Sequence, residues 1–240
     1  MLDSKGKTNS TMKITRQDLC RWEFTAATVE ERDLFLKSLK NWNITFPGDL
    51  EIKFLYGRML ITMGEKDEGI KLLKSILSVN PEYEKVYEEL YKNCVDAEER
   101  AFYEQYLSFF QEREIQSSQQ SWVAELLAVK HGLSKGESAN SEKNLVALMG
   151  KFPENILIPI YHLRLILETK DDYSVLQFSK IYHEKWAFCV FFMLIYAEEL
   201  SKFGSEVEAI NVFREAVYQD HLGIVARTWW GDDNQYLNLW

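Results

Sequence analysis

Histidine and cysteine are the side chains most often used to bind metals or to act as nucleophiles, and their spacing in this chain favours neither chemistry. The four histidines are scattered along the sequence: His131, His162, His183 and His221. The three cysteines are equally far apart: Cys20, Cys94 and Cys189. No HxH, HxxxH, HExxH or CxxC pattern occurs, so no local ligand set has the spacing of a zinc or redox site. We expect no metal site and interpret the cysteines as reduced core thiols.

Paired acidic residues are the other candidates for chemistry, and they are adjacent in sequence: Glu98-Glu99, Glu198-Glu199 and Asp232-Asp233. Adjacent helical residues point about 100° apart, so these carboxylates face different surroundings and do not form an acid–base dyad. The chain also lacks the GxSxG pattern of serine hydrolases and the glycine-rich loops that bind nucleotide phosphates. We predict that the protein is not an enzyme and binds no cofactor.

The composition is that of a chain that packs into a core. Hydrophobic residues make up 46% and aromatic residues 14%, while the formal net charge of −9 repels phosphate backbones. The longest apolar run, residues 186–197, is shorter than the roughly 20 residues that cross a bilayer, and we expect a buried helix there. Residues 1–15 are polar and lack a signal-peptide core; we interpret them as a disordered leader or a cloning remnant, with Met12 as an alternative start. We expect a cytoplasmic protein.

The elements that must position any site repeat along the chain. Pro47 and Pro81 lie 34 residues apart, and each follows an amphipathic segment that it terminates. Pro153 fixes a second phase, shifted by four residues, and the shift falls in the polar segment 111–121. The capping-box pattern S/T/D-x-x-E recurs at Thr28, Asp96 and Ser205, where a second helix of a unit is expected to begin. The predicted units are 16–49, 50–83, 84–121, 122–155, 156–189 and 190–223.

The unit length and its small residues resemble the tetratricopeptide repeat (TPR) family. The unit 50–83 matches the family pattern at Tyr56, Gly57, Leu60, Gly69, Leu73 and Pro81, and departs from it at Lys53 and Ile76. The unit 190–223 matches at Met193, Tyr196, Ala197, Leu200, Ala209, Phe213 and Ala216, without the proline. The other units keep the apolar rhythm and largely lose the small residues. The resemblance implies an all-α fold, a right-handed α-solenoid of about five to six antiparallel helix hairpins in a TPR-like superhelix over residues 16–223.

The resemblance also implies a concave groove lined by the first helix of each unit. The ninth position of the six units is occupied by Phe24, Arg58, Lys92, Lys130, Arg164 and Glu198. It is therefore basic in four consecutive units. The fifth position is mainly apolar: Cys20, Phe54, Glu88, Leu126, Ile160 and Leu194. One interpretation is an ordinary solvated face; the other is a basic stripe that recognises a peptide with acidic residues or a terminal carboxylate, beside apolar contacts from Phe54, Leu126 and Ile160. The asparagine and lysine set of the carboxylate-clamp TPR proteins is not matched, although Lys92 and Lys130 resemble its lysines.

The segment 224–240 holds three of the seven tryptophans, including Trp229 and Trp230. Such a segment is a capping helix over the last unit, an aromatic patch that docks on a partner, or the start of a following segment. We favour the capping helix.

Three functions agree with these features. The first is a protein-binding scaffold or adaptor that uses the groove. The second is an assembly factor or chaperone subunit that uses apolar surfaces at 186–197 and 224–240. The third, RNA binding by helical repeats, fits the net charge least.

Overall fold

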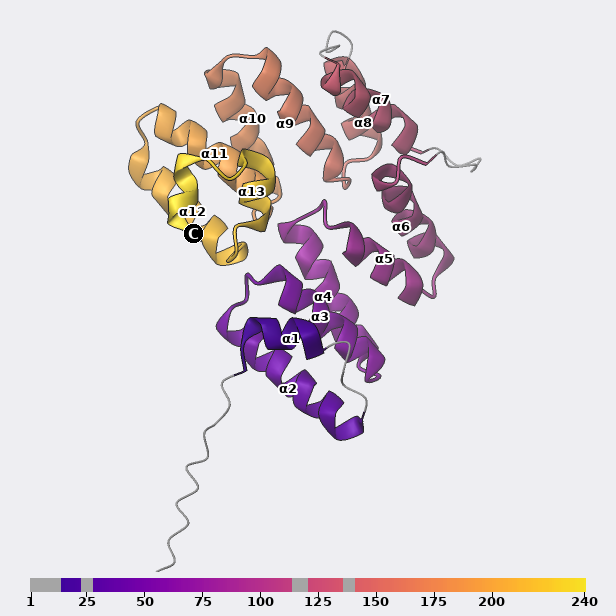
Figure 1. The fold of residues 1–240 in the computed structure, drawn as a ribbon. Coiled ribbons are helices and arrows are strands. Elements are labelled where there is room, and N and C mark those ends of the chain that lie inside the picture. Colours follow the sequence, from indigo (N-terminus) through magenta and orange to yellow (C-terminus); the bar gives the residue numbers. More distant parts are fainter. Residues whose placement is uncertain (1–13, 23–27, 114–120, 136–140) are drawn as a thin grey trace, which may run out of the picture.

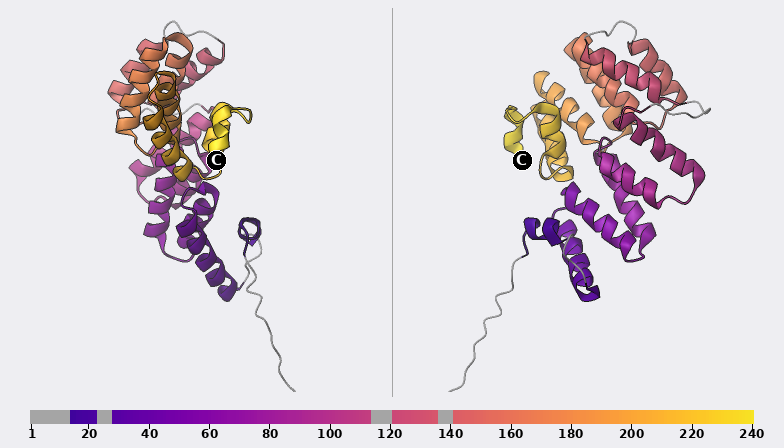
Figure 2. Two further views of the ribbon diagram at one scale, coloured as in Figure 1. Left: turned by 90° about the vertical axis from the view of Figure 1, so that its left-hand side faces the viewer. Right: turned by 45° about the vertical axis from the view of Figure 1, so that its right-hand side comes forward.

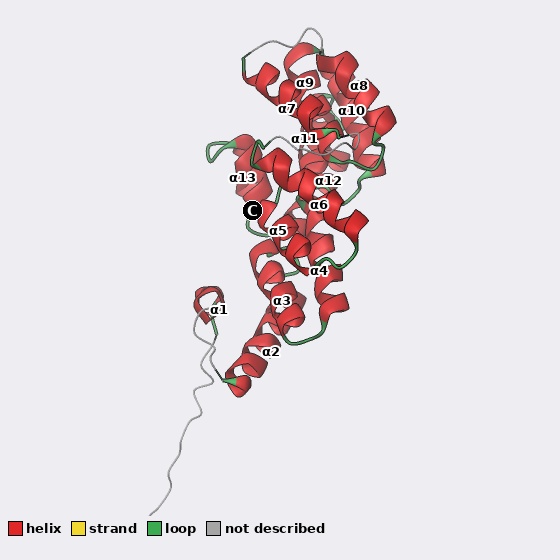
Figure 3. Cartoon of the chain, turned by 90° about the vertical axis from the view of Figure 1, so that its right-hand side faces the viewer, coloured by secondary structure: helices red, strands yellow, loops and turns green. Residues whose placement is uncertain are grey.

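The computed structural model describes residues 14–22, 28–113, 121–135 and 141–240. Within these ranges the chain forms α-helices and one 3₁₀ helix, with no strand (Figure 3), so the predicted all-α fold is confirmed. The helices are α1 (Arg16–Trp22), α2 (Val29–Thr45), α3 (Leu50–Thr62), α4 (Lys66–Val79), α5 (Glu84–Asn93), α6 (Ala97–Phe110), α7 (Val123–Ser134), α8 (Ser141–Lys151), α9 (Leu157–Thr169), α10 (Asp172–Lys185), α11 (Val190–Lys202), α12 (Glu206–Gln219), α13 (Ile224–Trp230) and the 3₁₀ helix η1 (Gln235–Leu239). Met12 and nearly all of the predicted leader, and most of the segment 111–121, lie outside the described residues.

The helices pack mainly against their neighbours in chain order (Figure 1). Each of the six expected units contains one such pair, from α1 with α2 to α11 with α12. Contacts between alternate helices, α1 with α3, α7 with α9 and α11 with α13, join one pair to the next. Figures 2 and 3 show that the short helices α1 and α13 lie on the same side of this array.

Two glycines allow α3 and α4 to pack closely, as the sequence predicts. A Cβ atom on Gly69 would lie 2.6 Å from the carbonyl oxygen of Gly57, and one on Gly57 would lie 2.9 Å from the Leu73 side chain. A larger side chain at either position would therefore push the helices apart. Two of the three predicted helix caps are also confirmed. Thr28 forms a complete capping box, and Asp96 accepts hydrogen bonds from two amides of the first turn of α6.

The third predicted cap, at Ser205, is wrong, because its side chain makes no capping hydrogen bond. Glu208, the acidic residue expected to complete that box, instead accepts a hydrogen bond from the Tyr196 hydroxyl at 3.0 Å.

The most apolar run of the sequence is a buried helix, as expected. Every residue from Val190 to Ala197 is buried in α11, while Ala187 and Phe188 of the preceding turn are exposed. Among the described helices, none combines the length and the hydrophobicity that a membrane crossing requires.

The two ends of the array touch. The backbone amide of His221, after α12, donates a 3.0 Å hydrogen bond to the carbonyl oxygen of Gly48, in the turn between α2 and α3. The imidazole of His221 stacks on the ring of Phe46 with centroids 5.1 Å apart. Gly48 is closely surrounded, since a Cβ atom there would lie 2.9 Å from the backbone nitrogen of His221 and closer still to the carbonyl oxygen of Tyr218. The curve of helices in Figure 1 is therefore closed by backbone contact between its first and last units.

Two histidines are held inside the hairpin α9–α10 and its neighbours. His162 is 1% exposed, and its Nδ1 lies 2.6 Å from the hydroxyl oxygen of Tyr182, whereas its Nε2 has no hydrogen-bond partner among the described residues. Burial lowers the pKa of His162, and it also lowers the pKa of the half-buried His183. The folded state thus favours neutral imidazoles.

Replacing Gly48 by alanine is expected to lower the free energy of unfolding by about 1–3 kcal/mol, because the added methyl group meets backbone atoms that cannot rotate away. Urea unfolding followed by circular dichroism measures the change. Gly150→Ala is the matched control, since a Cβ atom there meets nothing within 4 Å and alanine favours the helix. Equal stability of the two variants would show that the ends are not in contact.

Acidification is expected to destabilise the fold through His162. Its folded pKa is below the unfolded value of about 6.5, so the unfolded state binds more protons and stability declines as the pH falls below that value. Burial raises the pKa of Asp220 to about 6, which acts in the opposite direction, so the test compares wild type with His162→Gln. Between pH 7.5 and 5.5 the wild type is expected to lose more stability in urea than the variant, by up to about 1.4 kcal/mol. An equal loss of stability in the wild type and in His162→Gln would rule out a neutral, buried His162.

Candidate functional site

A pocket of about 350 Å³ lies between α3 and α5, beside α1. Most of its lining side chains lie three or four residues apart along one face of α3 and one face of α5. Cys20 of α1 and Tyr83 of the turn before α5 flank them. We name it the α3–α5 pocket; it is lined by Cys20, Glu51, Phe54, Leu55, Arg58, Tyr83, Lys85, Glu88, Glu89 and Lys92. Three of the predicted binding residues, Phe54, Arg58 and Lys92, therefore share one hollow.

The charges around the α3–α5 pocket are balanced. Three carboxylates and three cations line it, and several are paired across or along the helices. Arg58 of α3 lies 3.3 Å from Glu89 of α5, and Lys92 lies 3.9 Å from Glu88. Because these charges cancel, the pocket does not attract strongly acidic or strongly basic ligands by net charge. Its cations can donate hydrogen bonds to a ligand, and its carboxylates can accept them.

Aromatic side chains form part of the wall of the pocket. Phe54 and Tyr83 have ring centroids 5.8 Å apart, and the guanidinium of Arg58 lies 5.5 Å from the centroid of Phe54. Burial, with the nearby carboxylates of Glu51 and Asp49, raises the pKa of Tyr83 to about 12. The Tyr83 hydroxyl is therefore neutral and able to donate a hydrogen bond at physiological pH.

The predicted basic column is a series of ion pairs. Lys130 lies 2.7 Å from Glu112, and Arg164 forms two hydrogen bonds with Glu82, at 3.1 and 2.8 Å. Together with Arg58 and Lys92, every basic residue of the column has a carboxylate neighbour. The other two entries of that column are not basic: Phe24 lies outside the described residues, and Glu198 accepts a hydrogen bond from the Trp230 indole at 3.1 Å. The column is therefore a set of cations that each lie beside a carboxylate: Arg58 pairs with a neighbouring helix, Lys92 with its own helix, and Lys130 and Arg164 with residues in turns.

The predicted apolar stripe is not a surface. Leu126 and Ile160 are 0% and 1% exposed and belong to the hydrophobic core, and Phe54 is 8% exposed at the wall of the α3–α5 pocket. Both α7 and α9 pack against several neighbouring helices, and Leu126 and Ile160 belong to the core that these helices share. Of the three apolar residues, only Phe54 borders a pocket.

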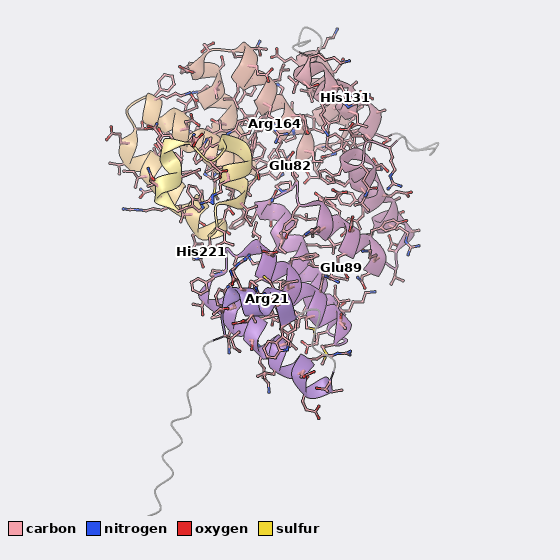
Figure 4. The ribbon with its side chains drawn as sticks, in the orientation of Figure 1. Arg21, Glu82, Glu89, His131, Arg164 and His221 are labelled. Carbon is pink, nitrogen blue, oxygen red and sulfur yellow. The ribbon has the colours of Figure 1, made fainter. Side chains whose placement is uncertain are left out.

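Arg164 lies at the centre of the array, enclosed by aromatic rings. Its guanidinium carbon lies 4.8 Å from the ring centroid of Tyr161, 5.3 Å from that of Phe191 and 5.7 Å from that of Trp229. Figure 4 shows Arg164 beside Glu82 in the middle of the curve of helices. A smaller pocket of about 130 Å³ remains next to them, bordered by α11 and α13. The bidentate pair thus joins the turn before α5 to α9. The rings of Phe191 and Trp229 add contacts from α11 and α13 to the same guanidinium.

The tryptophans of the segment 224–240 pack onto the array. Trp229 meets Phe191 edge-to-face at 4.8 Å, and Trp230 lies within 6.0 Å of Phe213 and Trp240. Asp220 accepts hydrogen bonds from three amides at the start of α13 and so fixes that helix at the end of α12. Both predicted aromatic residues, Trp229 and Trp230, are half-buried by these contacts.

The carboxylates Glu82, Glu89 and Glu112 are the site residues that sequence reasoning missed. Glu89 lies three residues before Lys92, the residue one repeat after Arg58, so a search at the repeat spacing finds the lysine and not the carboxylate. The other two carboxylates are unrelated to their cations by the period and depend on the curvature of the array.

Comparison with known proteins gives no match: no family model and no curated protein is similar to the chain. Among the described side chains, no group of three histidines, cysteines or carboxylates is placed to hold a metal ion.

The Glu82–Arg164 pair is expected to stabilise the fold measurably. A double-mutant cycle with Glu82→Gln and Arg164→Gln should give a coupling energy of about 1–2 kcal/mol in urea unfolding, because the pair is bidentate and only 24% of the Arg164 side chain is exposed. The matched control is the cycle at Glu125 and Lys151, a 3.6 Å pair with nearly half of each side chain exposed, where coupling near zero is expected. Equal coupling in the two cycles would contradict the central role of Arg164.

Proposed function

We propose that the protein is a non-enzymatic binding module, a TPR-like α-solenoid that serves as a scaffold or adaptor. Its ligand is a segment of another protein, held in the α3–α5 pocket. The observation that carries the proposal is the convergence of Phe54, Arg58 and Lys92 from two helices on one hollow of about 350 Å³. This volume lies within the usual range of ligand pockets.

A polypeptide fits the lining better than a small anion or a nucleic acid. The pocket combines aromatic walls with three carboxylates and three cations, and polypeptides carry both charges and apolar side chains. Phosphate backbones, in contrast, need an excess of cations. Because each cation of the basic column has a carboxylate neighbour, we favour a segment with both signs of charge over a purely acidic one.

The placement of the alternative surfaces favours this proposal over an assembly factor or chaperone that uses residues 186–197 and 224–240. Most of the first run is buried in α11, and the tryptophans of the second pack on the array. Cys20, Cys94 and Cys189 form no disulfide with one another, which agrees with a reducing compartment, and we propose the cytoplasm.

The proposal predicts that charge reversal in the pocket abolishes peptide binding. The labelled full chain is incubated with an array of immobilised peptides that samples a proteome, and the bound peptides are titrated by fluorescence anisotropy. For these peptides Arg58→Glu/Lys92→Glu is expected to weaken binding at least about tenfold, since it leaves Glu88 and Glu89 without their cations and adds two carboxylates to the pocket.

Lys71→Glu/Lys180→Glu is the matched control, because both lysines are exposed and neither lines the pocket. Circular dichroism verifies that both double variants fold. Peptides that bind the pocket variant and the control equally would place the ligand elsewhere and contradict the proposal.

A further inference from the structure

One arrangement recurs along the inner face of the array: a cation placed over an aromatic ring and beside a carboxylate. Arg58 has Phe54 and Glu89, and Lys130 has Phe109 at 5.5 Å and Glu112 at 2.7 Å. Arg164 has the same surroundings, with Tyr161 as the ring and Glu82 as the carboxylate. The three sites therefore share one local chemistry.

At Arg164 a segment outside the helix pairs adds a further aromatic ring to this arrangement. Trp229 of α13 places its ring 5.7 Å from the Arg164 guanidinium, and the next residue, Trp230, donates its indole N–H to Glu198 of α11. The segment 224–240 thus docks on the inner face through two aromatic side chains, one over a cation and one hydrogen-bonded to a carboxylate. After this docking 24% of the Arg164 side chain is exposed, and the pocket that remains beside it measures about 130 Å³.

Arg58 borders a larger pocket than Arg164 does. The side chain of Arg58 is 41% exposed, and the adjoining α3–α5 pocket measures about 350 Å³. The pocket also holds a carboxylate, Glu88, whose side chain is 42% exposed and whose cation lies 3.9 Å away. The two tryptophans contact a cation and a carboxylate at the other end of the array. A cation and a carboxylate also line the α3–α5 pocket.

We propose that the α3–α5 pocket receives an aromatic side chain of the partner segment, with tryptophan preferred, stacked on Arg58 as Trp229 is stacked on Arg164. The inference rests on the proposed function and names the side chain that the site selects. The negative face of the ring attracts the guanidinium, and Glu88 accepts the indole N–H. A neutral aromatic side chain also suits a pocket whose three carboxylates and three cations balance.

The test uses the full chain and four probe peptides, acetyl-Gly-Ser-X-Ser-Gly-amide, in which X is Trp, Phe, Leu or Asp. Binding is followed by ¹H–¹⁵N NMR, including the Nε–H signal of Arg58, which reports a ring stacked on the guanidinium. We expect the Trp peptide to shift this signal and to bind at least about fivefold more tightly than the Leu peptide, with Phe between them. The Asp peptide is expected to bind more weakly than the Trp peptide.

Arg58→Gln is expected to reduce the Trp preference to less than about twofold, while Lys71→Gln, outside the pocket, leaves it unchanged. If the four peptides shift pocket signals with equal affinity, the aromatic inference is overturned and the proposed function stands. If none of them shifts pocket signals while array peptides still bind in a manner sensitive to Arg58→Glu/Lys92→Glu, the aromatic inference is again overturned alone. If no peptide from either set depends on the pocket, both are overturned.

Discussion

The ion pair between Glu82 and Arg164 is the contact around which the array is arranged. It joins residues 82 positions apart, and it brings the turn before α5 against α9, whose neighbours α11 and α13 complete the aromatic enclosure. A guanidinium removed from water needs both a hydrogen-bonded carboxylate and polarisable rings to offset its lost hydration. Arg164 has both, and its partners come from several units. The surroundings of Arg164 are therefore occupied largely by the protein itself, whereas the α3–α5 pocket is a larger hollow of about 350 Å³.

The balance of charge on the inner face explains how an acidic protein displays a column of cations. The formal net charge is −9, and each cation of the column lies next to a carboxylate. Such pairs contribute little free energy when they are exposed and more when they are partly buried and bidentate. Their larger effect is on geometry, because they hold long side chains in fixed positions around the pocket. Recognition by such a surface depends on shape and on paired groups more than on net attraction.

The features that depend on local sequence could be predicted, and those that depend on curvature could not. The bounds of the helix pairs follow from turn prolines such as Pro81, and the close approach of α3 and α4 follows from Gly57 and Gly69. The clustering of Arg58 with Lys92 follows from equivalent positions in adjacent units. In contrast, Leu126 has the same unit position as Phe54 but is 0% exposed, whereas Phe54 also borders the α3–α5 pocket, and the shared position does not predict this difference. The partner of Arg164 lies three units away and has no counterpart in the repeat period.

The contact between Gly48 and His221 has a consequence for how the chain folds. Hairpins formed by neighbouring helices need little loop closure and form quickly, and an open row of them can unravel one pair at a time from either end. A hydrogen bond and a ring stack between the first and last units close the chain between residues 48 and 221 into one loop, whose entropy must be lost before the contact forms. Closure is therefore a late step, and once made it protects both ends against fraying. The same row of helices gains the all-or-none unfolding of a compact domain.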